Sequence, residues 1–349
     1  MIVLKKSGLL VLLLTFTLAS FSDDTIRVNS FNSFHLITRD NLWLSTGNSS
    51  GLFFNGRQRM IGFDTGTSFK NGDFHRISEA GEKTQYSFNT KSYLPLGDKI
   101  FTSGGFEYNK LTEQGARWAG TYDPYRGNPY LLADSLSGAE WLKENYRLTG
   151  QMAFALSSKL IFGFALDYFA AVGAKQKDPR PYNLVTSFKL NPSILLIRTN
   201  YVLGFDLSYN NRKEEIEYDV KRSHFSPTYF MFRGMGFYTK EIDMGYKRFQ
   251  FSRDASAGIQ LQKDFDGLQS LTEIRGNYAF EGIEDGDNMI KEDGGDWKTY
   301  KIELNEHLKI VKGNHINSFA GKLNFFNGDG TEYTQTKVKE GDITRYITI

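Results

Sequence analysis

The chain of 349 residues contains no cysteine, which excludes disulfide bonds, thiolate metal sites and a cysteine nucleophile. Its formal net charge is only +2, without the excess of lysine and arginine that nucleic-acid binding requires. Beyond the N-terminal segment it has no run of 18 consecutive apolar residues, so no further transmembrane helix is expected. The mature protein is therefore either soluble or crosses a membrane as a β-barrel.

Aromatic residues and glycine are abundant instead. The chain has 29 Phe, 19 Tyr and 34 Gly against 7 Pro, a mixture that favours β structure over helix bundles. Charged residues make up 23% and hydrophobic residues 40%, ordinary shares for a folded chain. The composition predicts a folded, all-β protein.

The N-terminus has the pattern of a cleavable export signal. Two lysines precede the apolar run Gly8–Ala19, and small residues lead on to Ser22. The run is too short for a membrane anchor, because a spanning helix needs about 20 apolar residues. We expect a signal peptide over 1–22 and one mature domain over 23–349.

Period-2 alternation is clearest in the middle of the chain. From Tyr146 to Leu156, alternate positions are apolar or aromatic, and the positions between them are polar or small. The run Leu160–Tyr168 repeats the pattern after only Ser157, Ser158 and Lys159, which predicts a β-hairpin. Four further hairpins are predicted around the turns Pro95–Asp98, Arg198–Asn200, Asp264–Gly267 and Lys312–His315.

Longer polar connections separate these five hairpins. The predicted strands of 10 to 13 residues match the ~9–11 that cross a bilayer at a tilt, and exceed the ~5–6 usual in globular sheets. An open sheet edge is not tolerated in lipid, so the sheet must close. The fold class predicted is a transmembrane antiparallel up-and-down β-barrel of the outer membrane, with about 12–16 strands. The predicted connections are Leu111–Lys143, Gly173–Pro181, Asn211–Tyr246 and Glu281–Asp296.

The two faces of the predicted strands differ in character. Five tyrosines are expected at strand ends next to long connections, where they would form a girdle at the level of the lipid headgroups: Tyr146, Tyr168, Tyr209, Tyr278 and Tyr300. The inward face is expected to be polar, with Arg147, Gln151, Asp167, Asn183, Lys189, Asp206, Gln260, Gln262, Glu273, Arg275 and Asn277.

The segment Asn41–Leu52, with the sequence NLWLSTGNSSGL, followed by hairpins of this kind, resembles uncharacterised Bacteroidota outer-membrane β-barrels, a family known only as a domain of unknown function. The resemblance implies location and architecture, and it supplies no catalytic or binding residues. Barrel chains typically finish on an aromatic residue, whereas this chain stops at Ile349, and members of the family look longer. We therefore expect the barrel to be incomplete at the C-terminus.

No catalytic, cofactor-binding or metal-binding residue is predicted, and no cofactor is expected. The histidines show no metal-ligand spacing, and no G-x-S-x-G motif is present. The acidic stretch Glu281–Asp296 offers oxygen ligands for Ca²⁺ but lacks the EF-hand pattern, so a solvated extracellular loop is favoured. The five histidines are His35, His75, His224, His307 and His315.

Two stretches between hairpins are unusual. The apolar stretch Pro227–Tyr238 is compatible with a plug in the lumen, a surface for a partner, or an additional pair of wall strands. The Tyr- and Arg-rich stretch Arg117–Tyr130 has the composition of a loop facing a sugar or a partner, although such loops are common at barrel rims.

Three function classes remain open. The favoured one is a non-enzymatic accessory or scaffold barrel that docks other envelope proteins through long extracellular loops. The alternatives are a passive channel for small solutes and a secreted soluble β-sandwich adhesin. The expected partners are the outer-membrane lipid bilayer, other envelope proteins and, for the channel, a small solute; nucleic acid is not expected.

Overall fold

The computed structural model describes residues 41–56, 59–134, 138–221, 224, 226–234, 237–242, 246–286, 291–312, 315–333, 335–340 and 343–348. They belong to one compact unit, Thr38–Ile349. The predicted signal peptide, 1–22, lies outside the described residues. None of the helical segments in the described part of the chain has the length and apolar content that a transmembrane helix needs.

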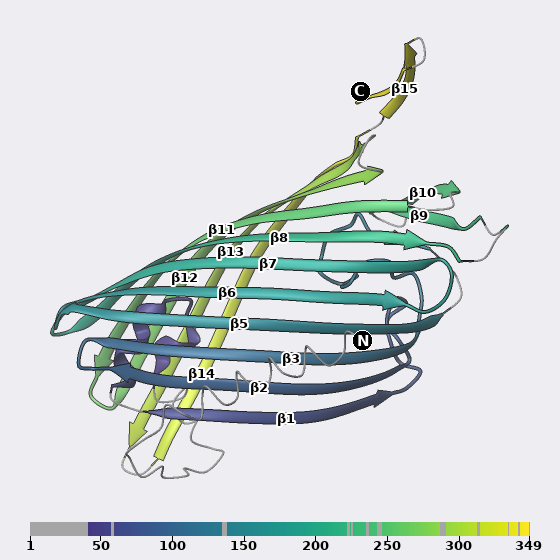
Figure 1. Ribbon diagram of the computed structural model, residues 1–349. Helices are drawn as coiled ribbons and strands as arrows, with labels where there is room; N and C mark the ends of the chain where they lie inside the picture. Colours follow the sequence, from purple (N-terminus) through teal and green to yellow (C-terminus); the bar gives the residue numbers. More distant parts are fainter. Residues whose placement is uncertain are drawn as a thin grey trace. The chain divides into compact units, whose positions relative to one another are not determined.

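Most of the described residues form one antiparallel sheet of eleven strands, in which nearly every strand pairs with the next one along the chain (Figure 1). This up-and-down order is the predicted one, and all five predicted hairpins are confirmed. The strands, in sheet order, are β1 (Met60–Asn71), β2 (Glu82–Leu96), β3 (Ile100–Ala116), β5 (Ala139–Ser157), β6 (Leu160–Lys175), β7 (Arg180–Ile197), β8 (Tyr201–Asp219), β11 (Tyr246–Phe265), β12 (Leu268–Gly286), β13 (Lys291–Lys312) and β14 (His315–Thr331).

The strands are longer than predicted, with 19 residues in β5 and 22 in β13. The predicted connections were therefore too long: β6 and β7 are separated only by 176–179, and β12 and β13 only by 287–290. The predicted strands end where alternate positions in the sequence cease to be apolar. Backbone pairing continues past that point because the opposite face is still packed.

The eleven-stranded sheet is open in the part of the chain that the structure describes. β1 pairs only with β2, and β14 pairs only with β13, so the predicted closure into a barrel is not observed there. The strands strictly alternate in direction, which makes the two edge strands run the same way.

In the large sheet, apolar side chains are exposed and polar side chains are buried, the reverse of the pattern in soluble proteins. On the exposed face of β5, Leu148, Met152 and Leu156 are 53%, 44% and 56% exposed. On the opposite face, which we call the packed face, Asn183, Asp206 and Gln260 are buried. Apolar side chains thus face outward while polar side chains are covered. The predicted division into an apolar outer face and a polar inner face is confirmed in this region.

A second, three-stranded sheet contains β4 (Leu132–Ala133), β9 (Thr228–Gly234) and β10 (Phe237–Ile242). The apolar stretch 227–238 therefore does form a strand pair, but β9 pairs with β4, so it is not part of the large sheet. A hairpin of β15 (Gln335–Glu340) and β16 (Ile343–Thr348) forms a third sheet. Among the described residues no second sheet covers the apolar face, as a β-sandwich would require.

Candidate functional site

The candidate site is the packed face of the large sheet and the two segments that cover it. The first is the inner segment, residues 41–55, which contains two 3₁₀ helices, η1 (Leu42–Ser45) and η2 (Ser49–Asn55). Asn41 and Asn48 cap them, because each side chain accepts a hydrogen bond from the backbone N–H two residues later. The Asn41 amide also donates to Asn55 Oδ1 at 2.6 Å, which joins the two ends of the segment.

The inner segment lies directly against the strands. Ser193 Oγ on β7 is 2.8 Å from Ser49 Oγ and accepts from the backbone N–H of Ser50 at 3.0 Å. Two strand glycines permit this approach: a Cβ on Gly163 would lie 2.3 Å from Ser50 N, and one on Gly204 would lie 2.6 Å from the Trp43 ring. The glycines are therefore required for the segment to sit on the sheet.

A charged network lies beside the inner segment on the packed face. The Arg275 guanidinium makes a bidentate pair with Asp206, at 2.7 and 2.9 Å, and a third contact with Glu273 at 2.8 Å. Gln260 donates to both carboxylates, at 2.6 and 3.0 Å. Asn191 also donates to Asp206, at 3.1 Å. Such a connected polar network holds its members in one arrangement.

The same network holds the inner segment. Asn48 donates to Gln260 Oε1 at 3.0 Å, and the Trp43 indole N–H donates to Gln262. The Trp43 side chain is buried. The inner segment is therefore bound by hydrogen bonds to a charged cluster whose members pair with one another, and the Gly47 N–H donates to Glu273 of that cluster at 3.5 Å.

The second cover is the strap, residues 117–134, which follows β3. Arg126 donates to both oxygens of Glu281 on β12, at 2.8 and 2.6 Å. Arg248 on β11 pairs with Asp285 at 2.6 and 2.8 Å and donates to the Tyr130 carbonyl at 3.2 Å. These contacts attach one part of the strap to β11 and β12.

Other contacts attach the strap to β5–β8. The Tyr122 N–H donates to Glu214 at 2.7 Å, and Asn183 donates to the Gly120 carbonyl at 2.8 Å. Asp134 forms a buried ion pair with Lys175. Burial raises the pKa of Asp134 and lowers the pKa of Lys175, so desolvation outweighs their attraction.

An apolar cluster fastens the end of the strap. Leu132 packs with Ile216 and Tyr218 of β8 and with Tyr229 and Met231 of β9, and all five side chains are buried. The stretch 117–130, whose composition suggested a loop facing a sugar or a partner, is largely folded back onto the sheet. The contacts of the strap explain why the strands are longer than predicted. The strap covers the parts of β6, β7 and β8 that were predicted to be loops.

The exposed face carries an apolar band that ends in an aromatic row. Tyr108 lies opposite Tyr146 and Tyr278 opposite Tyr300, with ring centroids 5.1 Å apart in both pairs. On β5 ten residue steps separate Tyr146 from Leu156, about 33 Å along a strand at ~3.3 Å per residue. At the ~35–45° tilt of membrane barrels this gives a band about 25 Å tall, the height of the lipid-facing band in such barrels.

The tyrosines were predicted at strand ends, and this detail is wrong. β5 begins at Ala139, and β8 continues past Tyr209 to Asp219. The strands therefore project beyond the aromatic row.

The structure also bears on the weaker site candidates. Glu281 and Asp285 lie on β12 and are paired with arginines, so the described part of the acidic stretch lies on strands; Asp287 lies outside the described residues. No cluster of three metal-ligating side chains occurs within the described ranges. Of the histidines, His307 and His315 lie on β13 and β14, His75 follows β1 and His224 lies between β8 and β9. His35 lies outside the described residues.

Sequence reasoning missed both covers of the packed face. The segment 41–52 was recognised only as a motif of a family, and no periodic pattern marks it as a buried element. The clue was compositional: two asparagines, a tryptophan and closely spaced serines in a short stretch supply caps and hydrogen bonds rather than a strand face.

The chain belongs to a family of unknown function, DUF6850, whose model matches residues 49–349. The expected membership in such a family is confirmed, while a Bacteroidota source stays a prediction. No curated protein matches the chain.

Three solved structures are distantly similar. The ferric yersiniabactin uptake receptor FyuA of Yersinia pestis has a TM-score of 0.41 and 8% identity, over 76% of this chain and 48% of the receptor. The outer membrane transporter YddB of Escherichia coli has a TM-score of 0.37 and 7% identity, over 82% and 40%. The P. putida toluene transporter TodX has a TM-score of 0.27 and 9% identity, over 84% and 94%. The chain thus spans less than half of the first two proteins.

Proposed function

We propose that the eleven strands are part of the wall of a β-barrel in the outer membrane of a diderm bacterium. The observation that carries the proposal is the exposed apolar band, about 25 Å tall and bounded by tyrosines. A soluble protein rarely exposes a continuous apolar surface of this size.

The same proposal requires the wall to contain more than these eleven strands. An unpaired strand edge costs several kcal/mol per backbone group in lipid. Because β1 and β14 run in the same direction, an antiparallel closure needs an odd number of further strands between them. A barrel of 12, 14 or 16 strands satisfies this condition, within the predicted range of about 12–16.

Within that class we propose an accessory or scaffold barrel that docks other envelope proteins, rather than an open passive channel. The inner segment and the strap both lie on the packed face, where a channel would need free space. The proposal includes no enzymatic activity.

One observation supports the alternative, a channel for small solutes. Arg147 and Asp167 form an ion pair on the packed face and remain 45% and 24% exposed, so part of this face is open to water. Polar side chains of this kind line solute pathways.

Two measurements test these proposals. Fractionation of cells should recover the protein in the outer membrane and release it only with detergent; recovery from the periplasm or medium without detergent would exclude the barrel. In planar bilayers the purified protein should be electrically silent, and partner proteins should co-purify with it. Stepwise conductance would instead support the channel.

A further inference from the structure

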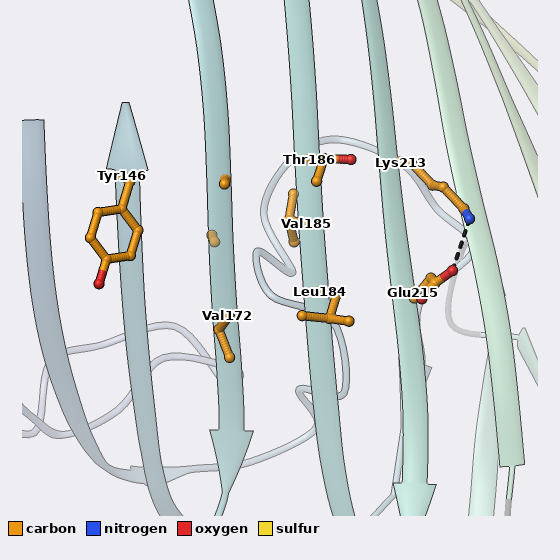
Figure 2. A pocket seen from close by; sticks show the side chains of 9 residues that line it. Tyr146, Val172, Leu184, Val185, Thr186, Lys213 and Glu215 are labelled. Atoms are coloured by element: carbon orange, nitrogen blue, oxygen red, sulfur yellow. Dashed lines mark hydrogen bonds and ion pairs between the residues drawn. The ribbon is translucent and has the colours of Figure 1, made fainter. Parts of the chain in front are cut away.

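The exposed face has a hollow beside Tyr146. It crosses β5–β8, has a volume of about 410 Å³ and is lined by Tyr146, Ala170, Thr186 and Lys213, among others (Figure 2). Tyr146 pairs with Ala170, Ala170 with Thr186, and Thr186 with Lys213, so these four residues form one row across four strands.

The hollow borders the aromatic row, which continues over β6 and β7 through the paired residues Tyr168 and Phe188. Elsewhere the row brings two tyrosine rings together, as at Tyr108–Tyr146 and Tyr278–Tyr300. The next two positions after Tyr146 carry Ala170 and Thr186, whose small side chains leave the space unfilled. The hollow is thereby continuous with the apolar band that the proposed function assigns to lipid.

Charged pairs border this level of the exposed face. At the rim of the hollow, Lys213 Nζ lies 2.8 Å from Glu215 Oε1, and the two side chains are 54% and 33% exposed (Figure 2). Lys110 and Glu144 form a comparable pair 3.8 Å apart, 50% and 42% exposed. Each pair presents one positive and one negative group at the height where lipid headgroups lie.

We propose that the hollow is a binding site for one phosphatidylethanolamine molecule of the bilayer. An acyl chain lies against Ala170, Leu184 and Thr186, the headgroup phosphate accepts from the Lys213 ammonium, and the headgroup ammonium donates to the Glu215 carboxylate. An ammonium has three N–H donors, so Lys213 can serve Glu215 and a phosphate together. The volume lies in the range of about 300–1,000 Å³ for small-ligand sites and suits one end of a lipid.

The charge pattern selects this headgroup. A rim with one cation and one carboxylate is complementary to a zwitterion, whereas a purely anionic headgroup meets repulsion from Glu215. The headgroup must also donate hydrogen bonds, which phosphatidylcholine cannot do. The inference rests on the proposed membrane location.

Native mass spectrometry of the detergent-purified full chain tests the site, with phosphatidylethanolamine, phosphatidylglycerol and phosphatidylcholine added separately. We expect one phosphatidylethanolamine to be retained in preference to the others. Ala170→Phe should reduce retention by about tenfold or more, because the ring fills the space of several methylene groups. Lys213→Met should reduce it by about two- to fivefold, as expected for an exposed ion pair.

Glu215→Gln should shift the preference from phosphatidylethanolamine towards phosphatidylglycerol, a result that a purely structural role would not produce. Lys322→Met is the control, because it breaks a Lys–Glu pair with Glu303 between β14 and β13, away from the hollow, and it should leave retention unchanged. Soluble phosphoethanolamine without acyl chains should not displace the lipid.

Equal retention of the three lipids, or full retention by Ala170→Phe, would overturn the site. Thr186→Phe fills the same hollow from β7 and replaces Ala170→Phe if that variant does not fold. The failure of the proposed membrane location would be seen separately, as release of the wild-type protein without detergent.

Discussion

The attachment of the strap to the packed face can be tested at the ion pair between Arg126 and Glu281. Replacing Arg126 by alanine removes a bidentate contact with Glu281, whose oxygens also accept from Asn128 at 2.6 Å. The two partners are 21% and 12% exposed, so the pair is neither a surface pair nor a fully buried one. Hydrogen bonds to charged groups contribute about 1.5–3 kcal/mol, and the solvent-screened geometry favours the lower half of that range.

A loss of about 1.4 kcal/mol corresponds to a tenfold rise in the open population of the strap. Amide hydrogen exchange should therefore accelerate by about tenfold in 117–134, while exchange in β5–β8 near the inner segment stays the same. Arg147→Ala is the control, because Arg147 makes an arginine–carboxylate pair with Asp167 that does not involve the strap. Unchanged exchange in the strap of Arg126→Ala would refute the claim that this ion pair holds it.

Three further predictions concern the sheet. Asp206→Ala leaves Arg275 without its bidentate partner and should cost about 3–5 kcal/mol in urea unfolding, whereas the triple change Asp206→Leu, Glu273→Gln and Arg275→Met, which removes all three charges, should cost much less. Gly163→Val places side-chain atoms against Ser50, so the inner segment should lose its exchange protection while the strands keep theirs; retained protection would contradict the close approach. Met152→Lys introduces a charge near the middle of the exposed band and should destabilise the protein in lipid by about 2–4 kcal/mol, whereas a change below about 0.5 kcal/mol would indicate that this face meets water.

The alternation of apolar and polar residues was sufficient to predict the hairpins, because each short turn fixes a register and one face of each strand is apolar over about ten residues. It failed beyond the tyrosines. In β8, for example, Asn211, Lys213 and Glu215 make the exposed face polar, and only the buried Glu214, Ile216 and Tyr218 on the other face indicate that the strand continues.

The covers of the packed face depend on contacts between distant parts of the sequence. Ser49 is joined to Ser193, and Arg126 to Glu281, and neither partner carries a local signal of the other. The polar inward residues were predicted correctly as a set, but their pairing around Arg275 follows from the register of β8, β11 and β12, which periodicity alone does not give.

The continuation of the strands past the tyrosine row changes what the proposed barrel would present to its surroundings. Instead of flexible loops at the lipid surface, a partner would meet a stiff, hydrogen-bonded collar, with the strap braced across it. Recognition by a rigid rim loses little conformational entropy on association. A docking partner would therefore need a complementary preformed surface, and substitutions in the collar would alter the fit more than the flexibility of the protein.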